Sequence, residues 1–191
     1  MNNLNVEKLL KQIEDENIDP GYQIRCIGKI LEEFYNKYEK KPILKFKKNN
    51  SKAILPKYQN KGDACFDFHA LIENEAGYVI LDPNSQVAIP TGLSAVIPEG
   101  YEIQVRPRSG MAFKHKITIT NSPGTIDEHY RNFILVLLFN LGKESIIINN
   151  GDRIAQGKLS KVYEPEIIEI DDFSEEEKNN DRGGGFGSTG T

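Results

Sequence analysis

From Pro42 onward the chain is divided into short apolar or alternating runs, which are separated by Gly, Pro, Asn and Asp. Many short strands at fairly even spacing predict a mainly β fold, a β-sandwich or jelly roll. The absence of a βαβ rhythm and of a GxxxxGK[ST] motif disfavours a Rossmann or P-loop fold. Strands are expected at residues 43–46, 79–81, 86–89, 102–105, 117–120, 133–139, 145–148 and 158–162.

Residues 1–41 have a different pattern, because their apolar residues recur at helical spacing. Asp19 followed by Pro20 suits a helix N-cap and a first helical position. We therefore predict a helical hairpin that packs on its own domain or a sister subunit, with recruitment of an unknown partner as the alternative. The apolar positions are Val6, Leu9, Leu10, Ile13, Ile24, Ile27, Leu31, Phe34 and Tyr38.

Three parts are predicted: a helical extension at 1–41, a β domain at 42–170, and an acidic linker with a Gly-rich tail at 171–191. The N-terminus lacks a secretory signal, and no apolar run approaches the roughly 20 residues that span a bilayer. We expect a cytoplasmic protein, with a nuclear location left open, and no membrane partner. Cys26 and Cys65 are expected to be reduced thiols, because they form no CxxC pair.

The formal net charge of −4 argues against a nucleic-acid partner, since such proteins are usually basic. A polyphosphate ligand would therefore need local attraction from arginines, backbone amides or a cation. In Arg106–Ala112, Arg108 offers a planar fork for phosphate and Ser109 a hydroxyl donor. Gly110 would let the backbone approach a ligand closely.

Residues 121–131 are predicted to be a turn between two strands, because Pro123 and Gly124 are turn residues. Backbone groups left unpaired in such a turn can read the edge of a base. Asp127 is a candidate for orienting or deprotonating a water, and Tyr130 offers a face for a sugar ring.

Three further segments carry candidate residues. Gln156 ends the turn segment Gly151–Gln156 and can bind a phosphate oxygen or a water. Asp67, in Gly62–Ala70, is a candidate for holding a hydrated divalent cation, since Mg²⁺ uses few carboxylates when phosphates supply the other oxygens. The glycine-rich tail contains Arg182 and Phe186, which a pure spacer does not need.

Taken in order, the five segments resemble the trimeric dUTP pyrophosphatases (dUTPases) over about residues 43–191. The motifs that carry the resemblance are Arg-Ser-Gly, Ile-Asp-x-x-Tyr-Arg, Gly-Asp-Arg-Ile-Ala-Gln and Gly-Phe-Gly-Ser-Thr-Gly. The resemblance implies a jelly-roll homotrimer with three active sites, each assembled from all three subunits. It also implies Mg²⁺-assisted hydrolysis of dUTP to dUMP and pyrophosphate, which limits uracil incorporation into DNA and supplies dUMP for dTMP synthesis.

The same resemblance implies a role for each candidate residue. The first subunit would surround the phosphates, the magnesium and nearby waters with Asp67, Arg108, Ser109, Gly110 and Gln156. A second subunit would supply Asp127 to position the attacking water and a base- and sugar-reading segment that comprises Asn121, Gly124, Thr125, Ile126 and Tyr130. The tail of the third subunit would close over the nucleotide with Arg182 on the γ-phosphate and Phe186, Gly187 and Ser188 near the uracil.

The chain departs from the family pattern at Cys65, Phe68, His129 and Asn132, none of which is a proposed reacting group. In the tail, three residues separate Arg182 from Phe186, one fewer than is usual in the family. Two alternatives remain open at this point. One is a dCTP deaminase of the same fold, with Glu128 as its acid–base group, and the other is a nucleotide-sensing or protein-binding module.

Overall fold

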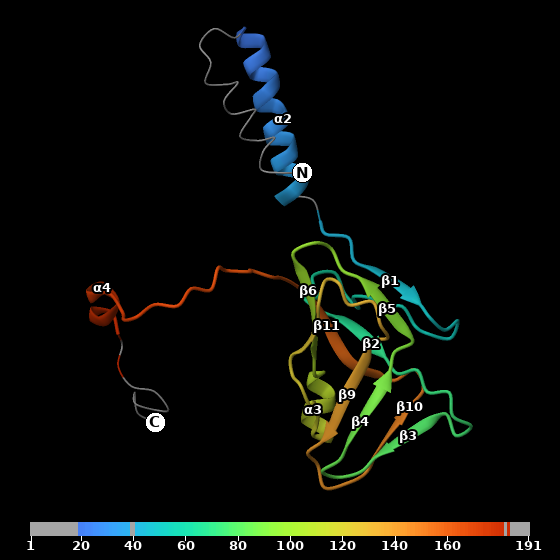
Figure 1. Cartoon of the computed structure of the whole chain (residues 1–191). Coiled ribbons are helices and arrows are strands. Elements are labelled where there is room, and N and C mark those ends of the chain that lie inside the picture. The colour runs from blue at the N-terminus through green and yellow to red at the C-terminus, as the bar shows by residue number, and fades with distance from the viewer. Residues whose placement is uncertain (1–18, 39–40, 182, 184–191) are drawn as a thin grey trace. The chain divides into compact units, whose positions relative to one another are not determined.

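The structure is a computed structural model that describes residues 19–38, 41–181 and 183 (Figure 1). The chain divides into two units, residues 1–161 and 162–191, each of which is described by itself. None of the described helices combines the length and apolarity that a membrane crossing requires. Cys26 and Cys65 are free thiols.

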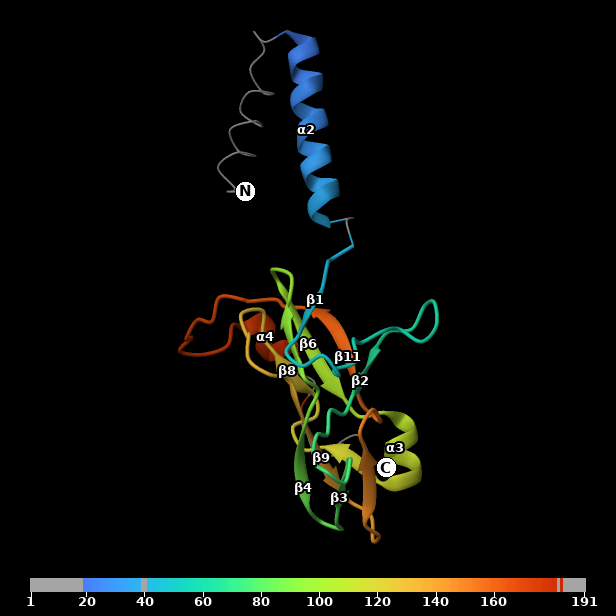
Figure 2. The ribbon, with the colours of Figure 1, turned by 90° about the vertical axis from the view of Figure 1, so that its right-hand side faces the viewer.

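The first unit is mainly β, as predicted, and all its strand pairs are antiparallel. Its sheets have the strand orders β1-β5, β10-β3, β2-β11-β6-β8 and β4-β9-β7. Figure 2 shows β6, β8 and β11 side by side in the four-stranded sheet. The strands are β1 (Lys45–Lys48), β2 (Phe66–His69), β3 (Tyr78–Leu81), β4 (Gln86–Pro90), β5 (Leu93–Val96), β6 (Tyr101–Arg106), β7 (Ile117–Ile119), β8 (Gly124–Ile126), β9 (Leu135–Asn140), β10 (Ile146–Asn149) and β11 (Arg153–Lys161).

Each of the eight predicted strands overlaps an observed one, whereas β2, β5 and β8 lie outside those predictions. β2 and β5 are only four residues long, and each buries three successive residues that include a polar one, Asp67 or Ser94, which a short sequence pattern does not predict. The segment at 121–131, predicted to be only a turn, contains the short strand β8. The turn residues Pro123 and Gly124 led to the prediction of a turn, although Gly124, Thr125 and Ile126 pair with β6.

One apolar core joins the sheets, and most of its innermost side chains are β-branched, as strands favour, with leucines and Phe68 among them. Gly157 on β11 is required by this packing. A Cβ atom there would lie 2.2 Å from the ring of Phe66 on β2, so only glycine allows the two strands to approach. Fully buried members of the core include Phe68, Leu81, Ile89, Leu93, Ile103, Ile117, Ile134, Val136, Leu138, Ile148 and Ile154.

Helix α2 (Pro20–Tyr38) begins at the proline, as predicted. The Asp19 carboxylate accepts a hydrogen bond of 2.9 Å from the backbone N–H of Tyr22, which is the expected N-cap contact. The first half of the predicted hairpin, residues 1–18, lies outside the described residues. Helix α3 (Ser109–His115), which the sequence does not predict, follows β6 and ends at Lys116 in the left-handed region.

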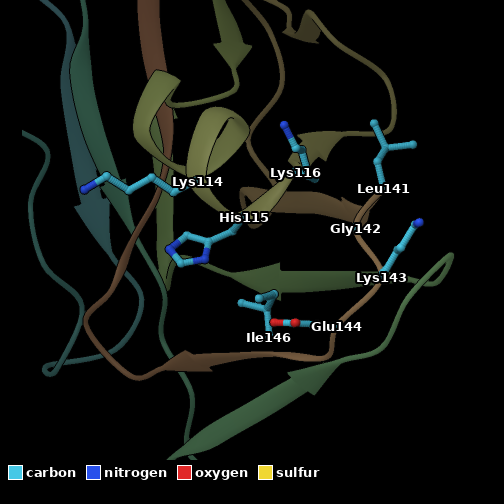
Figure 3. Close-up of a pocket in the computed structure, with 8 residues that line it drawn as sticks. All are labelled: Lys114, His115, Lys116, Leu141, Gly142, Lys143, Glu144 and Ile146. Atoms are coloured by element: carbon cyan, nitrogen blue, oxygen red, sulfur yellow. The ribbon is translucent and has the colours of Figure 1, made fainter.

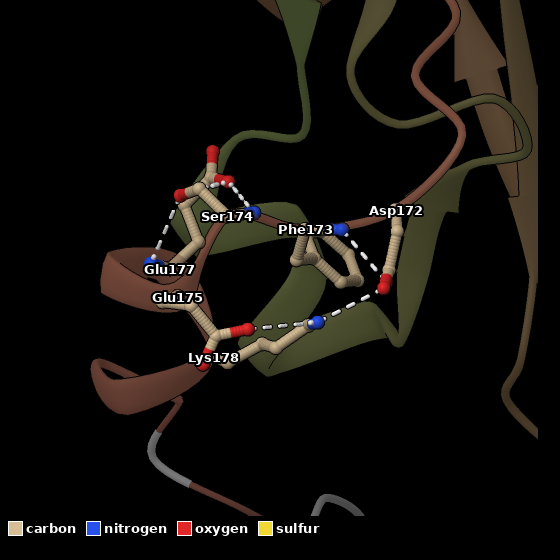
Figure 4. Close-up of polar contacts among 6 residues, drawn as sticks. All are labelled: Asp172, Phe173, Ser174, Glu175, Glu177 and Lys178. Atoms are coloured by element: carbon tan, nitrogen blue, oxygen red, sulfur yellow. Dashed lines mark hydrogen bonds and ion pairs between the residues drawn. The ribbon is translucent and has the colours of Figure 1, made fainter.

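The second unit contains helix α4 (Glu175–Asn179), which begins with a reciprocal capping box (Figure 4). The Ser174 hydroxyl accepts from the backbone N–H of Glu177, and the Glu177 carboxylate accepts from that of Ser174. The Ser174 hydroxyl also donates to the Glu177 carboxylate at 2.7 Å, and this bond, together with that from the Ser174 backbone N–H, lowers the pKa of Glu177. The Lys178 ammonium bonds Asp172 at 2.9 Å and Glu175 at 3.3 Å, and the first of these contacts lowers the pKa of Asp172.

Candidate active site

The four-stranded sheet places residues from separate motifs at one level. Gln156 on β11 pairs with Asp67 of β2 on one side and with Arg106 of β6 on the other. One residue along β6, Val105 pairs with Gly124 at the start of β8. The antiparallel register therefore brings the segments of Asp67, Arg108, Gly124 and Gln156 to the same end of the sheet, although up to 89 residues separate them in sequence (156 − 67).

Asp67 is the centre of a charged cluster at this end, which we call the arginine cluster: Asp67, Arg108 and Arg153. The carboxylate is buried and accepts from Arg108 Nε at 3.0 Å and from Arg153 Nη1 at 3.2 Å. Arg108 Nη1 also donates to the carbonyl oxygen of Arg153 at 3.0 Å. The fork of Arg108 is thereby fixed by two partners, while its remaining N–H groups are available to an anionic ligand.

Arg153 is a member that the sequence reasoning missed. It lies in the Gly-Asp-Arg-Ile-Ala-Gln motif three residues before Gln156, at a position where the pairing of β11 with β2 is irregular. Because of this irregularity, the side chain of Arg153 does not follow the regular alternation of side chains between the two faces of β11. Its contact with Asp67 therefore cannot be predicted from the motif alone.

His69 is the other residue of interest that the sequence left unassigned. It lies two residues after Asp67, and its buried Nδ1 has no hydrogen-bond partner in the described part of the chain. Burial lowers its pKa, as do the charges of Arg153, Arg108 and Lys57, whereas Asp67 raises it. The imidazole is therefore held in its neutral form beside two arginines.

The residues predicted to follow Arg108 open helix α3. Arg108 is the N-cap residue with extended backbone, and both Ser109 and Gly110 are exposed in the first turn. The hydroxyl and backbone of this turn consequently face solvent next to the arginine cluster. Their predicted contact with phosphate stays a prediction.

Asn121, Gly124 and Thr125 lie at the edge of the four-stranded sheet. A Cβ atom at Gly124 would be 3.1 Å from the Asn121 amide nitrogen and 3.4 Å from Val105 Cβ, so Asn121 packs closely against this strand. Ile126 is buried and pairs with Ile103, while Thr125 is exposed. Since β8 is the terminal strand of its sheet, part of its backbone faces away from β6.

Asp127 and Tyr130 lie at the opposite end of β8, in the loop 127–133, which we call the aspartate loop. Ile126 of β8 pairs with Ile103 of β6. Ile103 lies three residues before Arg106, so roughly 10 Å along the strand separates the two positions. The Asp127 carboxylate is exposed and has no hydrogen bond or ion pair within the described residues. One chain thus gathers Asp67, Arg108 and Gln156 but leaves Asp127 at a distance.

Two pockets of the described residues contain none of the predicted site residues. One, of about 400 Å³, is lined by Lys114, His115, Lys116, Lys143 and neighbours, and its lysines point away from one another (Figure 3). The other, of about 550 Å³, is mainly apolar and lies beside Phe46, Tyr58 and Phe66. We place the site on the sheet end instead, because convergent charged groups rather than a closed cavity mark a site for phosphate.

The predicted tail residues Arg182, Phe186, Gly187 and Ser188 lie outside the described residues. Among residues 19–38, 41–181 and 183, no group of three or more His, Cys, Asp or Glu side chains is arranged to hold a metal. Asp67 therefore offers a single carboxylate, and both its oxygens already accept from guanidinium groups.

The geometry defines a β protein whose sheet carries fixed arginine forks for an anionic ligand. The chain belongs to the dUTPase family, whose model matches residues 51–190. It is 48% identical to the deoxyuridine 5'-triphosphate nucleotidohydrolase of Nautilia profundicola over 147 residues, covering 77% of this chain and 98% of that protein. The enzyme of the same name from Helicobacter pylori is 42% identical, with coverage of 77% and 96%. The family is one of enzymes, the dUTP diphosphatases, and α2 lies outside the family match.

Solved structures agree with this assignment. A variant of the dUTPase of Staphylococcus bacteriophage 80alpha, solved with dUpNHpp, matches with a TM-score of 0.63 and 25% identity, covering 78% of this chain and 99% of that chain. A dUTPase from phage phi11 of S. aureus, which coordinates a structural Mg(II) ion, matches with a TM-score of 0.61 and 24% identity, covering 69% and 98%. The second match supports the fold alone.

Proposed function

We propose that this protein hydrolyses dUTP to dUMP and pyrophosphate by attack of an Asp127-oriented water on the α-phosphorus. The observation that carries the proposal is the arginine cluster, at the same end of the sheet as Gln156, in a chain that belongs to the dUTPase family. The reaction would limit uracil incorporation into DNA and supply dUMP for dTMP synthesis.

The phosphate end of the site is built from fixed donors. Asp67 and the Arg153 carbonyl oxygen orient the guanidinium of Arg108, so its free N–H groups meet the triphosphate without a search over side-chain conformations. Ser109, the backbone of Gly110 and the Gln156 amide would add neutral donors around the same oxygens. This arrangement stabilises the charge that develops during phosphoryl transfer.

Magnesium enters the proposal as an ion held mainly by the triphosphate. When bound, it neutralises charge on the phosphate oxygens. A single carboxylate already bonded to two arginines does not form a protein cage for a cation, but this donor set fits an ion that keeps its waters and is bound through phosphates. Asp67 would then reach the ion through a water.

The nucleoside end would be supplied by a neighbouring subunit. The edge of β8, with Asn121, Gly124, Thr125 and Ile126, has backbone groups facing away from β6 that can read uracil. The ring of Tyr130 would pack on deoxyribose and crowd out a 2′-hydroxyl. The Asp127 carboxylate, exposed and without a bonded partner in the described part of the chain, is suited to accept a proton or hydrogen bond from the attacking water.

The proposal includes a homotrimer. Asp127 lies toward the other end of the sheet from the arginine cluster in one chain, which supports a site that combines residues from two copies. A third copy would contribute Arg182, Phe186, Gly187 and Ser188. Light scattering of the purified protein should give three times the chain mass of 21.6 kDa.

The proposed activity is tested by pyrophosphate release from dUTP, dCTP, dTTP, dATP and dGTP with Mg²⁺. We expect release only from dUTP, and a fall of about 10²-fold or more in Asp127→Asn, which keeps the shape but loses the charge. Asp63→Asn, another exposed carboxamide replacement, serves as the matched control and should retain full activity. Equal hydrolysis of all five nucleotides, or an unaffected Asp127→Asn, would refute the proposal.

A further inference from the structure

Glu128 follows Asp127 directly, yet its side chain is held in a different way. Its Oε2 accepts a hydrogen bond of 2.8 Å from the backbone N–H of Gly100, 28 residues away in sequence. The Glu128 side chain is 29% exposed, whereas Asp127 is open to solvent. A glutamate at this position is thus committed to a contact with another segment.

The partner of Glu128 is the turn that starts β6. Gly100 has a φ of 74°, in the left-handed region, and the next residue, Tyr101, closes the turn by donating to the Pro98 carbonyl at 3.2 Å. The turn leaves the Gly100 N–H pointing out of β6, where the Glu128 carboxylate meets it. This bond ties the aspartate loop to the strand that also leads to Arg108.

The other contacts of the aspartate loop fix its far side. The backbone N–H of Tyr130 donates to the Asp127 carbonyl at 3.1 Å, and the Tyr130 hydroxyl donates to the Phe133 carbonyl at 3.0 Å. Arg131 Nη1 bonds the carbonyl oxygens of Glu128 and Tyr130. These bonds hold Tyr130 within the loop. On the other side of the loop, the β8–β6 pairing ends at Ile126, directly before Asp127, and the Glu128–Gly100 bond continues the attachment directly after Asp127.

We infer that Glu128 is a positioning residue that sets the place of the Asp127 carboxylate through its bond to the Gly100 N–H. The inference rests on the proposed function, in which Asp127 orients the attacking water. Removal of the bond leaves Asp127 attached through Ile126 of β8 and through the Tyr130 N–H, but takes away the contact that fixes the residue directly after it. Because a displacement of about 1 Å at a reacting group can cost on the order of 10²-fold in rate, the effect falls on kcat.

Three substitutions of Glu128 distinguish the effect of its side-chain length from the effect of its charge. Glu128→Gln keeps an acceptor oxygen at the same distance and loses only the charge, so its kcat should stay within about 3-fold of wild type. Glu128→Asp keeps the charge but is one methylene shorter, and Glu128→Ala removes the acceptor. Both should lower kcat by about 10- to 100-fold, with KM for dUTP within about 2-fold, because Tyr130 keeps its own bonds.

The matched control is Glu99→Ala, which removes an exposed carboxylate from the same turn without removing the Glu128 bond. It should leave kcat unchanged. Thermal unfolding and light scattering on every variant check that the assembly is intact. If Glu128→Ala does not fold, the contrast between Glu128→Gln and Glu128→Asp still decides the question.

Full activity of Glu128→Asp, or a loss in Glu128→Gln as large as in Glu128→Ala, would overturn the inference, since charge and not reach would then matter. A rise in KM for dUTP at unchanged kcat in Glu128→Asp and Glu128→Ala would overturn the inference as well. The proposed function has separate outcomes, because it fails if the wild type does not release pyrophosphate selectively from dUTP or if Asp127→Asn remains active.

Discussion

The two ends of the β2-β11-β6-β8 sheet contrast in how their charged groups are held. At one end, the carboxylate of the arginine cluster is buried and bonded to two guanidinium groups. At the other, the Asp127 carboxylate is exposed and unpaired within the described residues, and only the backbone around it is fixed. In the proposed mechanism, the first arrangement orients cations for the triphosphate, whereas the second leaves the carboxylate that would act on the attacking water in contact with solvent. Binding groups here are fixed in advance, and the proposed reacting group is kept open.

The largest effect is expected at Arg108. Arg108→Ala removes the fork that the cluster orients, and we expect kcat/KM for dUTP to fall by about 10²- to 10³-fold. Arg108→Lys keeps the charge without the fork, and should recover only a minor part of the loss. Steady-state pyrophosphate release measures both. Full recovery by lysine would show that charge alone is needed at this end, so that an oriented guanidinium would not distinguish it from the Asp127 end.

Asp67 should matter for stability as well as activity. Asp67→Asn leaves Arg108 and Arg153 without an ionic partner, and we expect a loss of about 1–3 kcal/mol in the free energy of unfolding. The figure is held below that of a fully buried pair because Arg153 is 45% exposed. Urea unfolding provides the measurement. The control is Asp82→Asn, because the Asp82 carboxylate accepts a hydrogen bond from Ser145 at the surface. Equal stability of the two variants would contradict the role given to Asp67.

Much of the fold was predictable, because β9, β10 and β4 show the apolar patterns of half-buried strands. β2 was not, since Phe66, Asp67 and Phe68 are buried in succession. The structure brings Asp67, Arg108 and Gln156, which the family resemblance groups around the phosphates, to one end of a sheet, and their roles there stay predictions. The motifs did not reveal that Asp67 bonds Arg153, because an ion pair across a strand irregularity depends on tertiary register. For the same reason the sequence did not indicate the contact of Glu128 with Gly100.

A smaller effect is expected from Tyr130→Phe in the aspartate loop. The change removes the hydroxyl that donates to the Phe133 carbonyl but keeps the ring proposed to pack on deoxyribose. We expect a loss of about 2- to 5-fold in kcat/KM, since a single exposed hydrogen bond contributes roughly 0.5–1 kcal/mol. Kinetics with dUTP measure the loss. A drop in kcat/KM as large as that of Arg108→Ala would mean that activity requires a fixed aspartate loop as much as it requires the arginine cluster.

The smallest effect concerns the neutral His69. Its pKa in the folded protein lies below the ordinary value of 6.5, chiefly through burial, so the unfolded chain binds more protons as the pH falls. The folded state is therefore destabilised on acidification below 6.5, and His69→Asn should show a shallower fall in Tm between about pH 7 and pH 5. His129→Asn, at a position whose side chain is 88% exposed, is the control and should follow the wild type. Parallel curves for wild type and His69→Asn would contradict this account.

The most direct test of the division between the two ends is complementation in mixed trimers. Arg108→Ala and Asp127→Asn are each expected to be inactive alone. If equal amounts assemble at random, one site in each mixed trimer, or about one third of the sites in mixed trimers, should combine an intact Arg108 from one chain with an intact Asp127 from its neighbour. Differently tagged chains, purified through both tags, ensure that mixed trimers are assayed. The account predicts recovery of dUTP hydrolysis to an appreciable fraction of the wild-type rate. Mixed trimers no more active than their parents would show that Arg108 and Asp127 must come from the same chain, and would contradict the account.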